Sequence, residues 1–85
     1  MFLHIGSDVS VPLREVVAIL GAEVMRAPAS REFLTLAKNA DRLRVVTDQP
    51  AKSFIITRDH VFLSPISSMT LLKRAARGSM EGSVI

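Results

Sequence analysis

Residues 52–77 read KSFIITRDHVFLSPISSMTLLKRAAR and hold the densest set of structural signals in the chain. Residues 54–57 and 60–63 are rich in β-branched and aromatic side chains and are too short for helices, which favours two strands. Arg58 and Asp59 separate them, and aspartate tolerates a left-handed backbone and can hydrogen-bond within its own turn. The pattern predicts a tight β-hairpin, although it lacks the glycine most typical of such turns.

A helix is predicted after this hairpin. Pro65 holds Ser64 in an extended conformation and prevents a helix from starting there. Ser67 or Ser68 can then cap a helix, because serine hydroxyls accept hydrogen bonds from the free N–H groups of the first turn. We expect Gly78 to end the helix and residues 78–85 to form a flexible tail.

The two faces of this predicted helix differ in character. Its positive residues occupy the outer side and the C-terminal turn, where positive charge complements the helix dipole. A solvated, stabilising role is the simplest explanation for them. The predicted apolar face consists of Met69, Leu72, Ala75 and Ala76, and the positive residues are Lys73, Arg74 and Arg77.

The first half of the chain reads mainly as strands. A short opening strand, residues 2–5, is followed by the turn-forming residues 6–8 and a second extended piece at 9–11. Branched side chains favour a strand over Glu15–Leu20. Pro12 also suits the first turn of a helix, so a helix over residues 12–24 remains an alternative.

The middle of the chain contains the clearest helical pattern. Ser30 is a suitable cap, and apolar residues recur after it at helical spacing. A strand over Leu43–Thr47 and a loop over residues 48–51 follow, leading into the hairpin. The apolar positions of the helix are Phe33, Leu34, Leu36, Ala37 and Ala40.

These elements predict an α+β fold in which residues 1–77 form a single domain. The sheet is expected to be small and mainly antiparallel, with one middle helix and one C-terminal helix, because loops this short allow a parallel crossover only through the middle helix. Adjacent apolar pairs such as Val16–Val17 and Ile55–Ile56 indicate a sheet covered on both faces. We expect helices on one face and a neighbouring subunit on the other.

Composition limits the size of the core. The chain has 85 residues, of which 48% are hydrophobic, and no cysteine. A chain this short buries only about 60–65% of the surface that its unfolded form exposes. The surplus of apolar residues therefore predicts a homo-oligomer whose interface covers part of that surface. The lack of cysteine rules out disulfides and fits a reducing cytoplasm.

No catalytic, metal-binding or cofactor-binding pattern occurs in the sequence. His60 follows Asp59, but adjacent residues of a strand point to opposite faces. His4 has no acidic or hydroxyl partner at motif spacing, and the glycines form no phosphate-binding loop. No apolar run approaches the ~20 residues of a membrane span. We therefore predict a protein that is not an enzyme and has no metal, cofactor, membrane or small-molecule partner.

The charge permits nucleic-acid binding without requiring it. Eleven Lys and Arg against eight Asp and Glu give a formal charge of +3, with a pI of about 10.2. Base stacking is disfavoured, since the only aromatic residues are four phenylalanines of mostly core character. Phosphate contacts are the better candidate, because identical subunits multiply a weak positive patch.

Three segments resemble one family of small bacterial proteins. They are FLHIGSDVSVPLREVVAIL (residues 2–20), SREFLTLAK (30–38) and KSFIITRDHVFLSPISSMTLLKRA (52–75). Together they resemble the extracellular-matrix regulators, specifically their B-type branch, over nearly the whole chain up to about Arg77. Ala51 stands where that branch often has proline.

The resemblance implies a regulator that binds duplex DNA. The A-type branch forms rings that bind DNA around their outer surface and activate genes for biofilm matrix and osmoprotection. Its contacts come from basic residues near the third strand, which correspond here to Arg14 and Glu15, and from an Arg-Arg pair in the loop before the hairpin. This chain has Gln49 and Pro50 at that pair, with Lys52 as the nearest positive charge.

Arg14, Gln49 and Lys52 are therefore the predicted DNA-binding residues. Loss of the arginine pair removes much of the phosphate-neutralising charge of the A-type branch. An oligomeric scaffold, or a partner of another regulator, that does not bind DNA is accordingly the alternative function.

Overall fold

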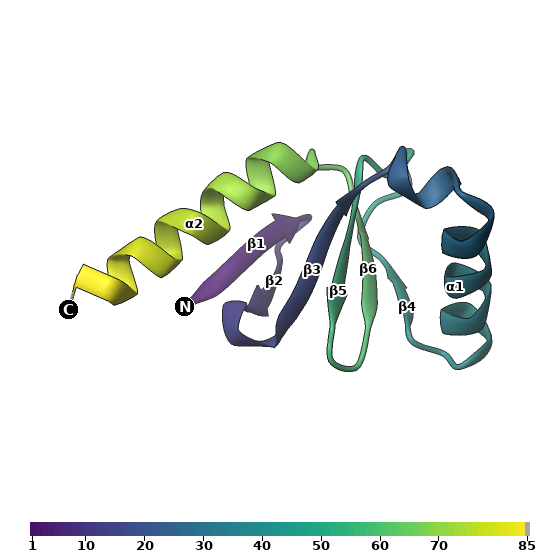
Figure 1. The fold of residues 1–85 in the computed structure, drawn as a ribbon, viewed down its shortest axis with the longest axis horizontal. Helices are drawn as coiled ribbons and strands as arrows, with labels where there is room; N and C mark the ends of the chain where they lie inside the picture. Colours follow the sequence, from purple (N-terminus) through teal and green to yellow (C-terminus); the bar gives the residue numbers. More distant parts are fainter. Residues whose placement is uncertain (85) are drawn as a thin grey trace.

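A computed structural model describes the backbone of residues 1–84 and the side chains of residues 1–77. Short strands dominate the first three quarters of the chain, and one helix lies in the middle and one at the end (Figure 1). In chain order the elements are β1 (Phe2–Gly6), β2 (Val9–Pro12), the 3-10 turn η1 (Leu13–Glu15), β3 (Val16–Gly21), the 3-10 turn η2 (Val24–Arg26), α1 (Pro28–Asn39), β4 (Leu43–Val45), β5 (Ser53–Thr57), β6 (Val61–Ser64) and α2 (Ser68–Val84).

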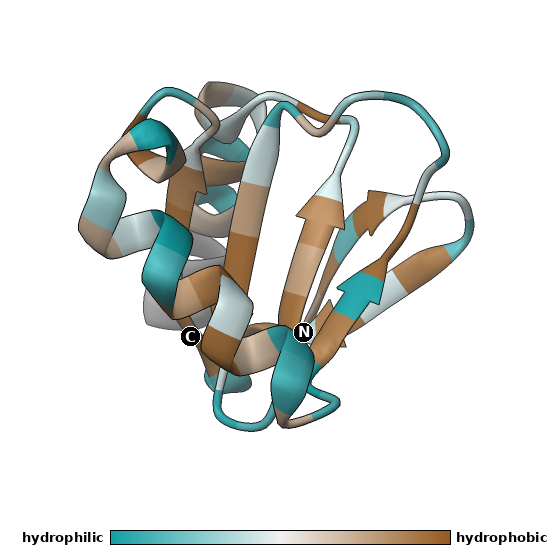
Figure 2. Ribbon diagram, turned by 90° about the vertical axis from the view of Figure 1, so that its right-hand side faces the viewer, coloured by the Kyte–Doolittle hydropathy of each residue, from teal (hydrophilic) through white to brown (hydrophobic). Residues whose placement is uncertain are grey.

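The strands form two sheets. β1 and β2 make an antiparallel hairpin, and a four-stranded sheet has the order β3-β5-β6-β4. β5 is antiparallel to both β3 and β6, whereas β4 lies parallel to β6 at the edge. The predicted α+β fold with mainly antiparallel strands is confirmed. In Figure 2 the hydrophobic residues concentrate on the strands and the hydrophilic ones in the turns.

Alternation along β5 separates two cores on the two faces of the larger sheet. Ile55 is fully buried in one core together with Leu3 of β1 and Leu71 of α2. Phe54 faces the opposite way and lies in a second core with Ala37 of α1. The β1–β2 hairpin and α2 thus cover one face, and α1 lies on the other (Figure 1). The expectation of helices on one face alone is wrong, because α2 lies on one face and α1 on the other. Cover of one face by a neighbouring subunit stays a prediction.

Both tight turns form, but by different means. Ser7 and Asp8 have positive φ values of 47° and 63° in the β1–β2 turn. At the β5–β6 turn, which comprises Arg58 and Asp59, neither residue is left-handed. The hydroxyl of Thr57 instead closes that turn, accepting a 3.1 Å hydrogen bond from the His60 N–H and donating one of 3.1 Å to the His60 carbonyl.

The segment after Pro12 is a strand, so the alternative of a helix over residues 12–24 is wrong. Pro12 ends β2, and a single 3-10 turn then reorients the chain into β3. The pairing with β5 shifts between Val16 and Ala18, which leaves Val17 as an extra residue with 68% of its surface exposed. This bulge keeps Val16 and Ile19 packed on the same core.

Several predicted helix and strand limits need correction. α1 begins at Pro28 rather than after Ser30, because proline fits the first helical position, where its missing N–H costs nothing. β4 ends at Val45, two residues short of the predicted limit. α2 continues through Gly78 to Val84, so the predicted end at Gly78 is wrong. Side chains after residue 77 lie outside the described part of the chain, and a flexible tail over residues 78–85 stays a prediction.

The predicted cap of α2 is confirmed, whereas its predicted inner face is not. The Thr70 N–H donates a 3.2 Å hydrogen bond to the Ser67 hydroxyl. Leu71 is fully buried and Ala75 is partly buried beside it. Met69 and Leu72, predicted to face the core, are 67% and 51% exposed. Only the tertiary placement of the helix shows which of its two apolar stripes meets the body of the protein.

Candidate nucleic-acid interface

Arg14 lies in the 3-10 turn between β2 and β3. This turn follows the extended Pro12, and its last backbone bond runs from the Val16 N–H to the Leu13 carbonyl. The Arg14 side chain is exposed. Val16, two residues further on, pairs with Thr57 in β5. Arg14 therefore stands at the end of the sheet where the β5–β6 turn lies.

Lys52 lies immediately before β5, at the other end of the sheet. Its backbone is held on both sides: the N–H donates to the Ser64 carbonyl at 2.8 Å, and the carbonyl accepts from the Ala22 N–H at 3.1 Å. The side chain is exposed. Gln49 lies in the preceding loop, where its N–H donates a 3.1 Å hydrogen bond to the Thr47 hydroxyl and its side chain is also exposed.

Arg14 and Lys52 consequently do not form one patch on a protomer. The β3–β5 ladder runs from the Val16–Thr57 pair to the Gly21–Ser53 pair. Its five residue pairs make four steps along β5, and at about 3.3 Å each these separate the two ends by roughly 13 Å. The two cations lie beyond these ends, which places them at two separate contact points.

Arg58 and Arg42 join Arg14 at its end of the sheet. Arg58 follows Thr57 in the β5–β6 turn, and the Arg42 carbonyl accepts a 2.9 Å hydrogen bond from the Val61 N–H. Both side chains are exposed. The sequence pattern places Arg58 only in the predicted hairpin turn, because the ladder register that brings this turn level with Arg14 is a tertiary feature. The position of Arg58 beside Arg14 follows once the pairing of residues 16–21 with residues 53–57 is known.

Two other arginines are engaged within the protomer. The Arg44 guanidinium donates to the carbonyls of Asp41 at 2.9 Å and Leu43 at 3.0 Å, and lies 3.7 Å from the Asp41 carboxylate. Arg74 donates a 3.1 Å hydrogen bond to the His4 carbonyl and so ties α2 to β1. These contacts leave Arg44 and Arg74 less available for phosphate than Arg14, Lys52 or Arg58.

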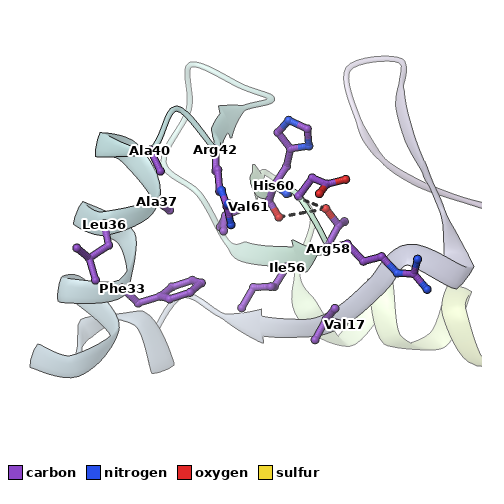
Figure 3. Close-up of a pocket in the computed structure, with 12 residues that line it drawn as sticks. Val17, Phe33, Leu36, Ala37, Ala40, Arg42, Ile56, Arg58, His60 and Val61 are labelled. Atoms are coloured by element: carbon purple, nitrogen blue, oxygen red, sulfur yellow. Dashed lines mark hydrogen bonds between the residues drawn. The ribbon is translucent and has the colours of Figure 1, made fainter.

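An open apolar groove of about 630 Å³ lies between α1 and the β5–β6 hairpin. Phe33 extends from α1 towards Ile56 of β5, and Val17 of β3 lies at one end (Figure 3). Arg42, Arg58, Asp59 and His60 also line it.

The described residues show no arrangement typical of a metal site or a membrane span. Among residues 1–77, no three His, Asp or Glu side chains come close enough to hold a metal ion. Neither helix, over the part of the chain that the structure describes, has the length and apolar character needed to cross a bilayer.

Comparison with known proteins identifies the family. Residues 2–75 match the model of the family described as extracellular matrix regulatory protein A-like. The chain is also 33% identical over 75 residues to extracellular matrix regulatory protein B of Bacillus subtilis (strain 168). These 75 aligned residues cover 88% of this chain and 90% of that protein. With the α+β fold described above, the chain therefore belongs to the extracellular matrix regulatory protein A-like family, on its B-type branch.

Proposed function

We propose that the protein is an oligomeric, cytoplasmic transcription regulator that binds the phosphates of duplex DNA through cations repeated over its subunits. The observation that carries this proposal is the exposure of Arg14 and Lys52 at the two ends of the β3–β5 strand pair. Both positions correspond to the DNA-contact regions that the resemblance to the A-type branch implies. Regulation of biofilm-matrix genes is part of the same proposal.

The separation of these two cations supports a requirement for assembly. A single protomer offers Arg14, with Arg58 nearby, at one end and Lys52 at the other. One or two phosphate contacts neutralise too little charge for stable binding at physiological salt. A ring or other oligomer repeats each contact at regular intervals, and the linked contacts raise the overall affinity without any new surface.

An oligomeric scaffold without DNA-binding activity is the second candidate. Gln49 and Pro50 stand where the A-type branch has an arginine pair, so Lys52 is the nearest cation that this loop offers to phosphate. Lys52 cannot replace a bidentate arginine, because its ammonium is a single point charge. In this function the protein binds another regulator through its surface.

Titration of a fluorescently labelled 30-base-pair duplex with the protein at several salt concentrations separates the two functions. We expect the anisotropy to rise on binding and the affinity to fall steeply as salt increases. The variant R14A/K52A should lose the anisotropy change while keeping the mass of the parent in light scattering. A parent protein that assembles but gives no anisotropy change at low salt supports the scaffold.

A matched control variant is R31A/K38A, which removes the same charge from exposed positions of α1. It should bind with an affinity close to that of the parent. If R14A/K52A binds as well as the parent, and K73A/R74A/R77A does not, the DNA-binding surface is α2.

A further inference from the structure

Helix α2 carries an apolar stripe that is exposed among the residues whose side chains the structure describes. Met69 and Leu72 are 67% and 51% exposed, and Ala76 continues the same stripe one turn later. The buried side of the helix, with Leu71 at its centre, points into the core. Exposed apolar side chains grouped on one helical face are typical of an interaction surface.

Helix α1 carries a second uncovered stripe. Phe33 and Leu36 are 40% and 61% exposed, and Ala40 is exposed one turn later. Phe33 and Leu36, with Ala40 at the C-cap of α1, form one wall of the groove, and the opposite wall includes Ile56 and the bulged Val17. The inner side of α1 packs on the sheet through Ala37, which is buried.

The two stripes match in spacing. Met69, Leu72 and Ala76 follow one another by three and four residues, and so do Phe33, Leu36 and Ala40. Each stripe thus spans eight residues, or about 10 Å of helix. Each has two large side chains followed by an alanine, where a partner helix can approach closely. They lie on opposite sides of the sheet (Figure 1), so neither can cover the other within one protomer.

Charge favours pairing between unlike stripes. No acidic residue occurs between Asp59 and Glu81, whereas Lys73 and Arg77 border the stripe of α2. Pairing of α2 with a second α2 would bring these cations together. Glu32 adjoins Phe33 and is exposed. With the helices antiparallel and Phe33 opposite Ala76, Glu32 lies beside Arg77 of the other helix.

We infer that the α2 stripe of one copy of this chain docks against the α1 stripe, in the groove, of the next copy. The inference rests on the proposed function only in taking the protein to be a homo-oligomer. Because the donor and acceptor surfaces lie on different sides of the protomer, the contact is heterologous and repeats from head to tail. An open assembly then keeps one free stripe at one end and one free groove at the other until it closes.

Two single variants and their mixture test this contact. Leu36→Asp disables the groove and leaves the stripe intact, and Leu72→Asp does the reverse. Each variant alone should fall from the mass of the parent assembly to that of a 9.3 kDa monomer in light scattering. The equimolar mixture should give a particle of about twice the monomer mass, because one intact stripe meets one intact groove. A symmetric contact would give no such recovery.

Val45→Asp is the matched control, since Val45 is 65% exposed on the edge strand β4 and takes no part in the proposed contact. It should keep the parent mass. Circular dichroism checks that each variant is folded. If an aspartate variant loses its helical signal, Leu36→Ser and Leu72→Ser replace the aspartate variants in the same experiment, because an uncharged side chain destabilises the fold less.

The outcomes distinguish this inference from the proposed function. A parent protein that is monomeric at all concentrations overturns the proposed assembly and this contact together. If the parent assembles and both aspartate variants keep its mass, only the contact is overturned. Two monomeric variants whose mixture stays monomeric rule out the head-to-tail arrangement.

Discussion

The Ser64 hydroxyl donates a 2.7 Å hydrogen bond to the backbone carbonyl of Ile5, 59 residues earlier in the chain. The same hydroxyl accepts a 3.0 Å hydrogen bond from the Ile66 N–H. The hydroxyl of Ser53, which pairs with Ser64 in the sheet, donates a 2.6 Å hydrogen bond to the Ile66 carbonyl. Both serines are fully buried. These two hydroxyls link strand β1, the β5–β6 hairpin and the turn that leads into α2.

Replacing Ser64 with alanine should destabilise the protein by about 2 kcal/mol. The Ile5 carbonyl and the Ile66 N–H would both lose their partner, and an unsatisfied buried polar group costs roughly 1–3 kcal/mol. Urea denaturation followed by circular dichroism measures the change. Ser10→Ala is the control, since Ser10 is exposed on β2 and should leave the midpoint unchanged. Equal midpoints for the two variants would contradict the bridging role.

Gly6→Ala should also destabilise the protein, by about 2 kcal/mol. Gly6 has φ +116°, and an added Cβ would lie 3.0 Å from the Pro65 ring. Alanine rarely adopts this backbone conformation, and the proline ring cannot turn aside. Gly21→Ala is the comparison, because the atoms nearest to a Cβ there belong to the flexible end of the Glu23 side chain. Thermal unfolding should show the larger loss for Gly6→Ala.

Ser67→Ala should cost about 1 kcal/mol, the usual loss when an N-cap hydroxyl is removed. The Thr70 N–H then loses its partner. Ser68, the first residue of α2, is the neighbour that the sequence did not distinguish from Ser67. Ser68→Ala should therefore have a smaller effect in the same urea titration. A larger loss for Ser68→Ala would reassign the cap.

The single variants Arg14→Ala and Lys52→Ala should weaken DNA binding independently of each other. The two positions lie at opposite ends of the β3–β5 ladder, roughly 13 Å or more apart. Sites this far apart without shared partners usually add in free energy within about 0.5 kcal/mol. The logarithms of the two affinity losses, measured by anisotropy, should therefore sum to that of the double variant. A strong departure from this sum would indicate that the oligomer brings Arg14 and Lys52 of different copies together.

Local sequence signals predicted the elements whose stability depends on near neighbours. The β5–β6 hairpin follows from two short β-branched runs around Arg58 and Asp59, and the Ser67 cap follows from a hydroxyl before an amphipathic run. The middle helix was recognised from its apolar spacing, although its start at Pro28 was missed. These features need only interactions between residues a few positions apart, so they can be read from the chain alone.

Tertiary packing decided which surfaces face inward and which residues meet. The apolar residues of α2 allowed two inner faces, and only contact with β1 and β3 selected Leu71 over Met69 and Leu72. The register of β3 on β5 placed Arg14 beside the Arg58 turn and far from Lys52. Both results depend on contacts between segments distant in sequence, where a shift of one residue in register or a rotation of one helix changes the outcome without changing any local signal.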